Sequence, residues 1–279
     1  MSEQGVDRSV DRYCVIGNPI AHSKSPEIHP VFAAQTGQHL SYVRCLAPLG
    51  GFADTVRDLV GQGYKGANVT VPFKIEAATV ATRLTERGRA AGAVNTLSFV
   101  DGEIIGDNTD GPGLVADIVR NAGVALANKR ILLLGAGGAA RGIMLPFLME
   151  RPASILVANR TVATAQALVA NFTGHDINVA ACGFGDIDGP YDIVVNATSS
   201  SLAAEMPPVP ASAFARGTLA VDIMYGDAPS PFMRFAAEHG ADTRDGLGML
   251  VEQAAEAFTV WRGVRPATAE VFNKLRVKK

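Results

Sequence analysis

Short apolar runs alternate with amphipathic stretches along most of the chain, and this alternation is typical of an α/β protein. The run at 131–134 is apolar throughout, which predicts a strand buried on both faces. Similar runs predict further strands at 13–16, 42–46, 67–71, 155–158, 177–181, 192–196 and 219–223. Helical spacing of apolar residues predicts helices at 52–60 and 74–87, and another from 249 to a stop at Gly263.

Glycines follow the predicted strand 131–134 at once. Gly135, Gly137 and the small residue Ala140 give the spacing Gly-x-Gly-x-x-Ala of a dinucleotide-binding turn. There the first glycine permits the sharp turn, the second lets the backbone approach a pyrophosphate, and the third small residue lets the helix pack on the strand. The free N–H groups of the helix start would face the anion. Glycine clusters also close ordinary turns, so this pattern alone leaves both interpretations open.

The residues about twenty positions after the glycines favour a nucleotide. The apolar run 155–158 ends there, and Asn159, Arg160 and Thr161 follow it. An acidic residue at this point would accept a hydrogen bond from a free ribose 2′-hydroxyl, whereas a guanidinium pairs with a 2′-phosphate. Arg160 therefore favours NADP over NAD, the alternative being a solvated arginine in a loop.

Composition narrows the possible functions. The chain has 279 residues, of which 48% are hydrophobic and 19% charged, with a formal net charge of -2, so it is long enough for two domains. No basic tract is present, so we expect a small-molecule substrate and neither nucleic acid nor a membrane as a partner. Three widely spaced cysteines fit a reducing cytosol, no signal peptide is evident, and a cytoplasmic protein is expected. Histidines and cysteines lack zinc-like spacing, so no metal is predicted.

Two serines stand near the first predicted strand. Pro26 directly after a serine is a helix-start signal, so Ser25 is expected to cap the following helix, which leaves Ser23 without that role. Two hydroxyl groups beside the positive end of a helix also suit a carboxylate ligand. Both interpretations remain open from the residues alone.

Lys74 is a candidate catalytic residue. Pro72 ends the predicted strand 67–71, and Lys74 would lie in the first turn of the helix 74–87, where the helix dipole disfavours a cation. A lysine whose charge is disfavoured by the helix dipole, at the carboxyl end of a strand, is a catalytic candidate, although most lysines are simply solvated.

The polar, glycine-rich stretch 106–113 suits a turn, an Asp helix cap or a domain hinge, and the spacing of its acidic residues does not suit a calcium site. We place the first domain boundary there.

The remaining polar segments follow strands of the second half. Residues 196–201 follow one predicted strand and are rich in hydroxyl groups, so they form either a plain loop or a wall of the cofactor site.

Pro146 lies within the helix that follows the glycine turn. It lacks the N–H that would bond the carbonyl of Gly142, so a kink in that helix is expected.

Taken together, these segments resemble the shikimate dehydrogenase family. The resemblance spans nearly the whole chain, in the blocks 15–26, 68–74, 92–96, 106–111, 135–142, 159–161, 196–199 and 245–249. It implies an N-terminal α/β substrate domain, formed by 1–110 and 246–279, and a doubly wound Rossmann-type NADP domain at 111–245. The C-terminal helices would return to the first domain.

The resemblance also implies an activity: NADP-dependent, reversible reduction of 3-dehydroshikimate to shikimate in the shikimate pathway, which leads to chorismate and the aromatic amino acids. Lys74 would exchange the proton as general acid and base, with Asp110 orienting it. The implied substrate pocket is lined by Ser23, Ser25, Thr70, Asn95, Tyr225 and Gln253. The implied NADP site consists of Gly135, Ala136, Gly137, Gly138, Ala139, Asn159, Arg160, Thr161, Ile223 and Gly246, with Glu86 on the nicotinamide side.

The chain departs from the family pattern at one position. Many relatives carry a second basic residue one helical turn after the arginine, where this chain has Thr164. The NADP preference is therefore expected to be moderate. Two other functions stay open, namely a quinate/shikimate dehydrogenase that uses NAD, and a non-catalytic NADP-sensing protein of the same fold. A monomer or a homodimer is compatible with the sequence.

Overall fold

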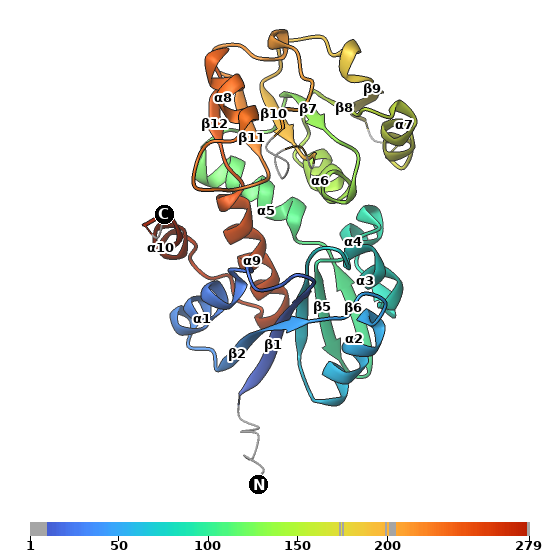
Figure 1. The fold of residues 1–279 in the computed structure, drawn as a ribbon, viewed down its shortest axis with the longest axis vertical. Helices are drawn as coiled ribbons and strands as arrows, with labels where there is room; N and C mark the ends of the chain where they lie inside the picture. Colours follow the sequence, from blue (N-terminus) through green and yellow to red (C-terminus); the bar gives the residue numbers. More distant parts are fainter. Residues whose placement is uncertain (1–9, 173, 175, 199, 201–204, 278–279) are drawn as a thin grey trace. The chain divides into compact units, whose positions relative to one another are not determined.

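The structure is a computed structural model that describes residues 10–172, 174, 176–198, 200 and 205–277. The chain divides into two compact units (Figure 1). Within the described residues, unit 1 holds the chain up to Thr109 together with Ala254–Leu275, and unit 2 holds Asp110–Gln253, Arg276 and Val277. The predicted functional boundaries at 110/111 and 245/246 stay predictions.

Unit 1 is built on a mixed sheet in the order β2-β1-β3-β5-β6-β4. Strands β1, β2 and β3 are parallel, β5 is antiparallel to β3, and β6 is antiparallel to β5. The carboxyl ends of β1, β3 and β6 and the amino end of β5 therefore meet at one edge of the sheet. The strands are β1 Asp11–Gly17, β2 Leu40–Leu46, β3 Gly66–Val69, β4 Arg83–Leu84, β5 Thr96–Val100 and β6 Glu103–Asp107.

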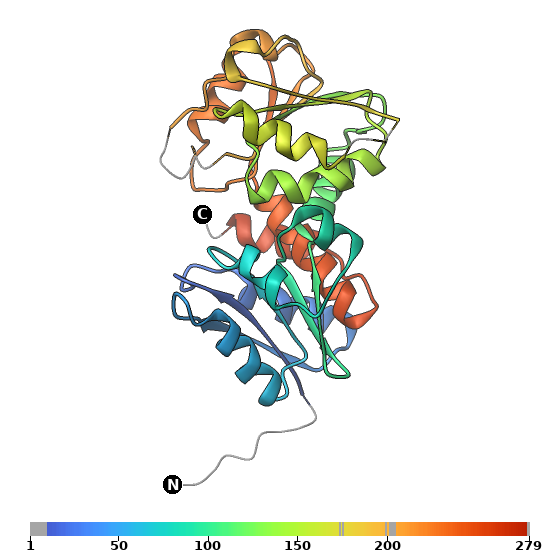
Figure 2. The same cartoon turned by 90° about the vertical axis from the view of Figure 1, so that its right-hand side faces the viewer.

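Helices cover this sheet (Figure 2). Helix α2 confirms the predicted amphipathic pattern, because Phe52, Val56 and Leu59 are buried against the apolar side chains of the sheet. The helices are α1 Ser25–Thr36, α2 Phe52–Gly61, α3 Lys74–Val80, α4 Glu86–Ala91, α9 Leu247–Arg262 and α10 Ala269–Val277, and the division between the units falls within α9. None of the described helices combines the length and apolarity needed to cross a membrane.

Unit 2 contains an entirely parallel sheet in the order β12-β11-β10-β7-β8-β9. This is the doubly wound order, with the chain reversing its direction of travel between β7 and β10. Residues 131–134 have no exposed surface, as predicted for a strand covered on both faces. The strands are β7 Arg130–Leu134, β8 Ser154–Ala158, β9 Asn178–Cys182, β10 Ile193–Asn196, β11 Leu219–Asp222 and β12 Asp242–Arg244.

Two helices of unit 2, α5 and α6, are in close contact beside Pro146, where a kink was predicted. Helix α6 continues through Pro146, and a methyl group on Gly111 of α5 would lie 2.1 Å from the carbonyl oxygen of Gly142 in α6. Glycine at 111 thus lets α5 pack directly on α6 beside the proline. The helices are α5 Asp110–Ala116, which continues as a π-helical turn Asp117–Asn121, α6 Gly138–Met149, α7 Val162–Ala170 and α8 Pro231–Glu238.

Two predicted elements in unit 1 were wrong. The stretch 74–87 is not one helix, because Ala81 adopts an extended conformation with ψ of 130° and ends α3, and the chain then forms β4 and α4. The strand predicted at 67–71 ends at Val69, since Thr70 enters a turn in which its carbonyl accepts a hydrogen bond from the Phe73 N–H.

Candidate active site

The edge of the unit 1 sheet described above gathers several of the predicted site residues. Lys74 is the first residue of α3, as predicted, and its side chain is half-buried. Its carbonyl oxygen accepts a hydrogen bond of 2.8 Å from the Val94 N–H, and the Val69 N–H donates at 2.8 Å to the carbonyl oxygen of Asn95. These backbone bonds bring Lys74, Thr70 and Asn95 to neighbouring positions although they come from different segments.

Asn95 is buried and firmly held. Its side-chain oxygen accepts from the Thr109 N–H at 2.8 Å and from the Thr96 hydroxyl at 2.9 Å, while its amide donates to the Thr109 hydroxyl at 2.9 Å. Thr109 directly precedes Asp110, which begins α5 of unit 2. The Asn95 side chain therefore fixes the backbone from which the predicted proton-orienting aspartate starts.

An ion pair between half-buried Arg87 and buried Asp107 supports the same stretch of chain. The Asp107 carboxylate accepts from Arg87 at 2.7 and 2.8 Å, from the Thr85 hydroxyl at 2.6 Å and from the Asn108 N–H at 2.7 Å. Burial raises the pKa of Asp107, but the hydrogen bonds and charge of Arg87 outweigh it, so that pKa lies below its usual value. Glu86, predicted to lie on the nicotinamide side, is exposed at the start of α4.

Ser25 does not have the capping role that the sequence pattern predicts. Ser25 is not the helix cap but the first residue of α1, and its backbone N–H donates to the Ser23 hydroxyl at 3.4 Å. The helix begins one residue earlier than the capping pattern assumes, which is why the prediction failed. The Ser23 hydroxyl also donates to that of Ser25 at 3.3 Å. Both hydroxyls therefore lie together at the helix start, as a carboxylate-binding pair requires.

In unit 2, the glycine turn has the geometry that a pyrophosphate site needs. Gly135 has φ of +101°, and a methyl group there would lie 3.0 Å from the carbonyl oxygen of Ala197, in the loop after β10. The turn therefore lies at the switch point between β7 and β10, where doubly wound sheets bind ligands. Methyl groups on Gly137 or Gly138 would meet no other atom within 4 Å, so backbone N–H groups at the start of α6 are open to an anion. Ala136 and Ala139 complete this turn.

The loop after β8 carries Arg160 with its side chain exposed. The Asn159 amide donates to the carbonyl oxygen of Thr161 at 2.9 Å, which shapes the loop before α7. Thr164 lies in the first turn of α7, where its N–H donates to the Thr161 carbonyl at 3.0 Å. The guanidinium thus has room for a phosphate beside it, with Thr164 one turn further along.

The loop after β10 is shaped by a buried polar pair. The Asn196 side chain accepts from the Thr198 hydroxyl at 2.7 Å and donates to Asp222 at 3.4 Å, and Asp222 accepts from Ser230 at 2.6 Å. Of the hydroxyl-rich stretch 196–201, positions 199 and 201 lie outside the described residues. Asn196 and Asp222 therefore tie together the loops that follow β10 and β11.

Four more of the predicted site residues come from the part of unit 2 that follows β11 in the chain, namely Ile223, Tyr225, Gly246 and Gln253. A methyl group on Gly246 would lie 2.0 Å from the carbonyl oxygen of Ile223, so the close approach of these two backbones requires glycine. Tyr225 lines a cavity of about 290 Å³, and its burial raises the pKa of the phenol. Gln253 packs its backbone against Gly113 of α5, where a methyl group would lie 2.6 Å away.

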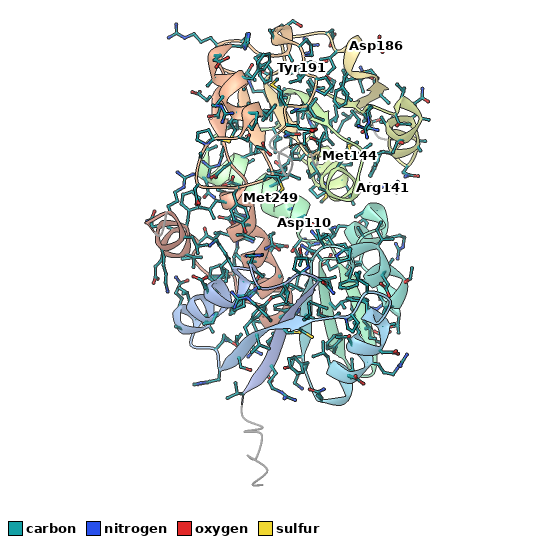
Figure 3. The ribbon with its side chains drawn as sticks, viewed as in Figure 1. Asp110, Arg141, Met144, Asp186, Tyr191 and Met249 are labelled. Atoms are coloured by element: carbon teal, nitrogen blue, oxygen red, sulfur yellow. The ribbon has the colours of Figure 1, made fainter. Side chains whose placement is uncertain are left out.

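A separate cavity of about 320 Å³ lies at the opposite end of the unit 2 sheet, beside the amino ends of β7, β8 and β9. Tyr191 and Asp186 line it, away from Asp110 and Met249 (Figure 3). Ligands of doubly wound sheets bind at the carboxyl ends, so this cavity is not the cofactor site. No cluster of His, Cys, Asp and Glu suited to a metal ion occurs within the described ranges.

Comparison with known proteins identifies the family. Residues 15–97 match the model of the shikimate dehydrogenase substrate binding domain, 117–223 that of shikimate/quinate 5-dehydrogenase, and 246–273 that of the shikimate 5′-dehydrogenase C-terminal domain. Among the most similar relatives, "Shikimate dehydrogenase (NADP(+))" of Janthinobacterium sp. (strain Marseille) is 62% identical over 96% of this chain and 98% of its own.

Solved structures agree with this comparison. An Ael1 enzyme from Pseudomonas putida is 48% identical with a TM-score of 0.91, covering 95% of this chain and 98% of its own. The shikimate 5-dehydrogenase of Thermus thermophilus, solved in complex with NADP(H) and shikimate, is 30% identical with a TM-score of 0.86, covering 97% of this chain and 100% of its own. The chain belongs to the shikimate dehydrogenase family.

Proposed function

We propose that this chain catalyses the NADP-dependent, reversible reduction of 3-dehydroshikimate to shikimate, the step of the shikimate pathway that leads towards chorismate and the aromatic amino acids. The observation that carries the proposal is the single sheet edge of unit 1, where Ser23, Ser25, Thr70, Lys74 and Asn95 gather. It combines a carboxylate-binding pair, hydroxyl-binding groups and a lysine, which are the groups that a hydroxylated cyclic acid requires. The relative that is 62% identical carries the name of this enzyme.

The proton chemistry belongs to the chain's own residues. In the oxidative direction, the reacting carbon of shikimate loses a hydride, and its hydroxyl proton passes to the amine of Lys74. Asp110 orients that proton transfer. In the reductive direction Lys74 returns the proton to the oxygen. NADP, when bound, supplies the hydride acceptor and, reduced, the hydride donor.

The remaining groups bind and orient the substrate. Ser23 and Ser25 at the start of α1 hold the carboxylate, which gains from the helix dipole as well as from hydrogen bonds. Asn95 and Thr70 hold ring hydroxyls, since both lie beside Lys74 at the sheet edge. Tyr225 and Gln253 of unit 2 complete the substrate-binding set.

The residues of unit 2 fit NADP. The open N–H groups at Gly137 and Gly138 suit the pyrophosphate, and Ala136, Ala139, Ile223 and Gly246 belong to the same proposed NADP site. Arg160, with Asn159 and Thr161, binds the 2′-phosphate. A charge-assisted hydrogen bond contributes about 1.5–3 kcal/mol, so Arg160 alone favours NADP over NAD by about one to two orders of magnitude. Glu86 lies on the nicotinamide side in this proposal.

One assay tests the proposal against its rivals. The purified protein is given shikimate or quinate with NADP⁺ or NAD⁺, and reduced cofactor is followed by its absorbance. Turnover should be highest with shikimate and NADP⁺, because the extra hydroxyl of quinate must fit beside Ser23 and Ser25, and an unpaired polar group costs about 1–3 kcal/mol. Equal kcat/KM for quinate and NAD⁺ would support a quinate dehydrogenase, and no turnover a non-catalytic NADP-binding protein. Either result overturns the proposal.

The proposal includes a small-molecule substrate, no nucleic acid or membrane partner, a cytoplasmic location, and action as a monomer or homodimer. Net charge and composition support the first two parts. Size-exclusion chromatography coupled to light scattering measures the oligomeric state, and a species larger than a dimer would contradict that part.

A further inference from the structure

Tyr42 and Asn68 form a buried polar pair that the mechanism above does not use. Tyr42 lies on the edge strand β2 and Asn68 on β3, with β1 between them. The Tyr42 hydroxyl reaches across β1 and donates to the Asn68 side-chain oxygen at 2.6 Å. Both residues are less than 8% exposed. Burying a hydroxyl and an amide costs free energy, and apolar side chains at both positions would avoid that cost.

The pair connects to Asn95. The Asn68 amide donates to the Asn95 carbonyl oxygen and to the Thr96 hydroxyl, both at 3.2 Å. The Thr96 hydroxyl in turn donates to the Asn95 side-chain oxygen at 2.9 Å. Asn68 therefore supports both the backbone and the side chain of Asn95.

The Tyr42 hydroxyl stays a donor in this pair. Burial holds the pKa of the Tyr42 phenol well above its usual value, so the hydroxyl keeps its proton and directs it to Asn68.

The ring of Tyr42 is itself fixed in place. It stacks on the His29 ring with 4.1 Å between centroids and 6° between planes. His29 lies on α1 and has no exposed surface, so the ring that supports Tyr42 is itself enclosed. The phenol oxygen therefore has little freedom to move relative to Asn68.

We propose that Tyr42 is a positioning residue of the substrate pocket, which through Asn68 and Thr96 holds the Asn95 amide in place. This inference rests on the proposed function, since Asn95 binds a ring hydroxyl in it. Asn95 does not touch the reacting bond, so its interaction is equal in the ground and transition states. Loss of the Tyr42 hydroxyl should then change KM and leave kcat nearly unchanged.

The test begins with Tyr42→Phe, which removes the hydroxyl and keeps the ring. One hydrogen bond contributes about 0.5–1.5 kcal/mol, so the KM for shikimate should rise about two- to tenfold while kcat stays within about twofold and the KM for NADP is unchanged. Tyr13→Phe is the matched control. Tyr13 is a buried tyrosine of the same sheet whose hydroxyl accepts from Arg262 at 3.4 Å, outside this chain of bonds, so its removal should leave both constants unchanged.

A double-mutant cycle with Asn95→Ala separates positioning from a general effect on structure. If Tyr42 acts through Asn95, Tyr42→Phe should have little further effect on KM in the Asn95→Ala background. The same factor in both backgrounds, or a KM change equal to that of Tyr13→Phe, overturns the inference.

If thermal unfolding shows that Tyr42→Phe does not fold, Thr96→Val decides the question. This variant removes the hydroxyl that links the Asn68 amide to the Asn95 side-chain oxygen, at a fully buried position, while keeping the shape of the side chain. A raised KM for shikimate supports the inference, and an unchanged KM overturns it. Absence of shikimate turnover in the unmodified protein would overturn the proposed function itself, whereas turnover that is insensitive to these substitutions overturns only the positioning role.

Discussion

Acid should destabilise this protein through His29, which has no exposed surface. Burial lowers the pKa of His29 from 6.5 to about 3, although Asn68 acts in the opposite direction. Neither ring nitrogen has a hydrogen-bond partner among the described residues. The imidazole therefore stays neutral in the folded state at every pH above about 3.

The size of the effect follows from the difference between the two pKa values. The unfolded chain binds a proton at His29 near pH 6.5, whereas the folded chain binds it only near pH 3. Between these values the unfolded state binds more protons, so stability is fully present above pH 6.5 and falls as the pH is lowered. One pKa unit corresponds to about 1.36 kcal/mol, which gives a loss of about 2 kcal/mol at pH 5 and about 4 kcal/mol at pH 3.

Urea unfolding followed by Trp261 fluorescence can measure this loss. Trp261 is the single tryptophan of the chain, and its ring centroid lies 5.5 Å from that of His29, so its signal reports on this part of unit 1. Between pH 8 and pH 5 the unmodified protein should lose about 2 kcal/mol more than His29→Phe, which keeps an aromatic ring without a titrating nitrogen. The control His39→Gln, at an exposed position, should lose as much as the unmodified protein.

Carboxylates that titrate in this range contribute equally to all three proteins, so they cancel in the comparison. Equal losses for the unmodified protein and His29→Phe would refute the reasoning, because the histidine would then bind protons equally well in the folded and unfolded chains.

Three further predictions concern the proposed site and the packing of α5 on α6. Lys74→Ala should lower kcat by roughly 10²-fold in the shikimate assay with little change in shikimate binding, and a variant that keeps most of its turnover would remove Lys74 from the mechanism. Arg160→Ala should abolish the NADP preference measured as the ratio of kcat/KM values, and Thr164→Arg should increase it most at low salt; an unchanged ratio in Arg160→Ala argues against a 2′-phosphate site. Gly111→Ala should lower the free energy of unfolding by about 1–3 kcal/mol or more, because its methyl group meets backbone of α6, whereas Gly137→Ala meets no neighbouring atom and should weaken NADP binding instead. Urea unfolding and NADP titration that give the two glycine variants the same behaviour would contradict this.

Most of the unit 2 sheet could be predicted from the sequence because its central strands β7, β10 and β11 are covered on both faces. A strand such as β7 then consists of a continuous apolar run, and the glycine turn directly after it fixes its direction and its ligand-binding end. Each signal lies within a short window of the chain. The ends of the predicted strands differ slightly, because the ends depend on pairing with neighbouring strands. The edge strand β12 was not predicted, because Asp242–Arg244 is short and polar and gives no apolar run.

The sheet of unit 1 could not be predicted in the same way. Its antiparallel hairpin β5–β6 places Asn95 at the same edge as Lys74, and a series of β-α-β units does not imply such a reversal. A signal was present, because Asp101 and Gly102 are a pair that favours two-residue hairpin turns, and both have positive φ, of 49° and 81°. The separate helices α3 and α4 were missed for a related reason, since the apolar spacing of 74–87 continues across the break at Ala81.

The identities of the site residues were easier to predict than the contacts that hold them. Lys74 and Arg160 indicate their chemistry by residue type and by position after a strand, which a local pattern can convey. The partners of Asn95 and Asp107 come from segments far away in the sequence, and their positions depend on strand register. Register is set by pairing across the whole sheet, so no short window contains it. The polar contacts behind the proposed site, from Tyr42 to Asn95 and from Arg87 to Asp107, therefore became visible only in the folded chain. In the proposed mechanism they hold the segments whose side chains bind and orient the substrate.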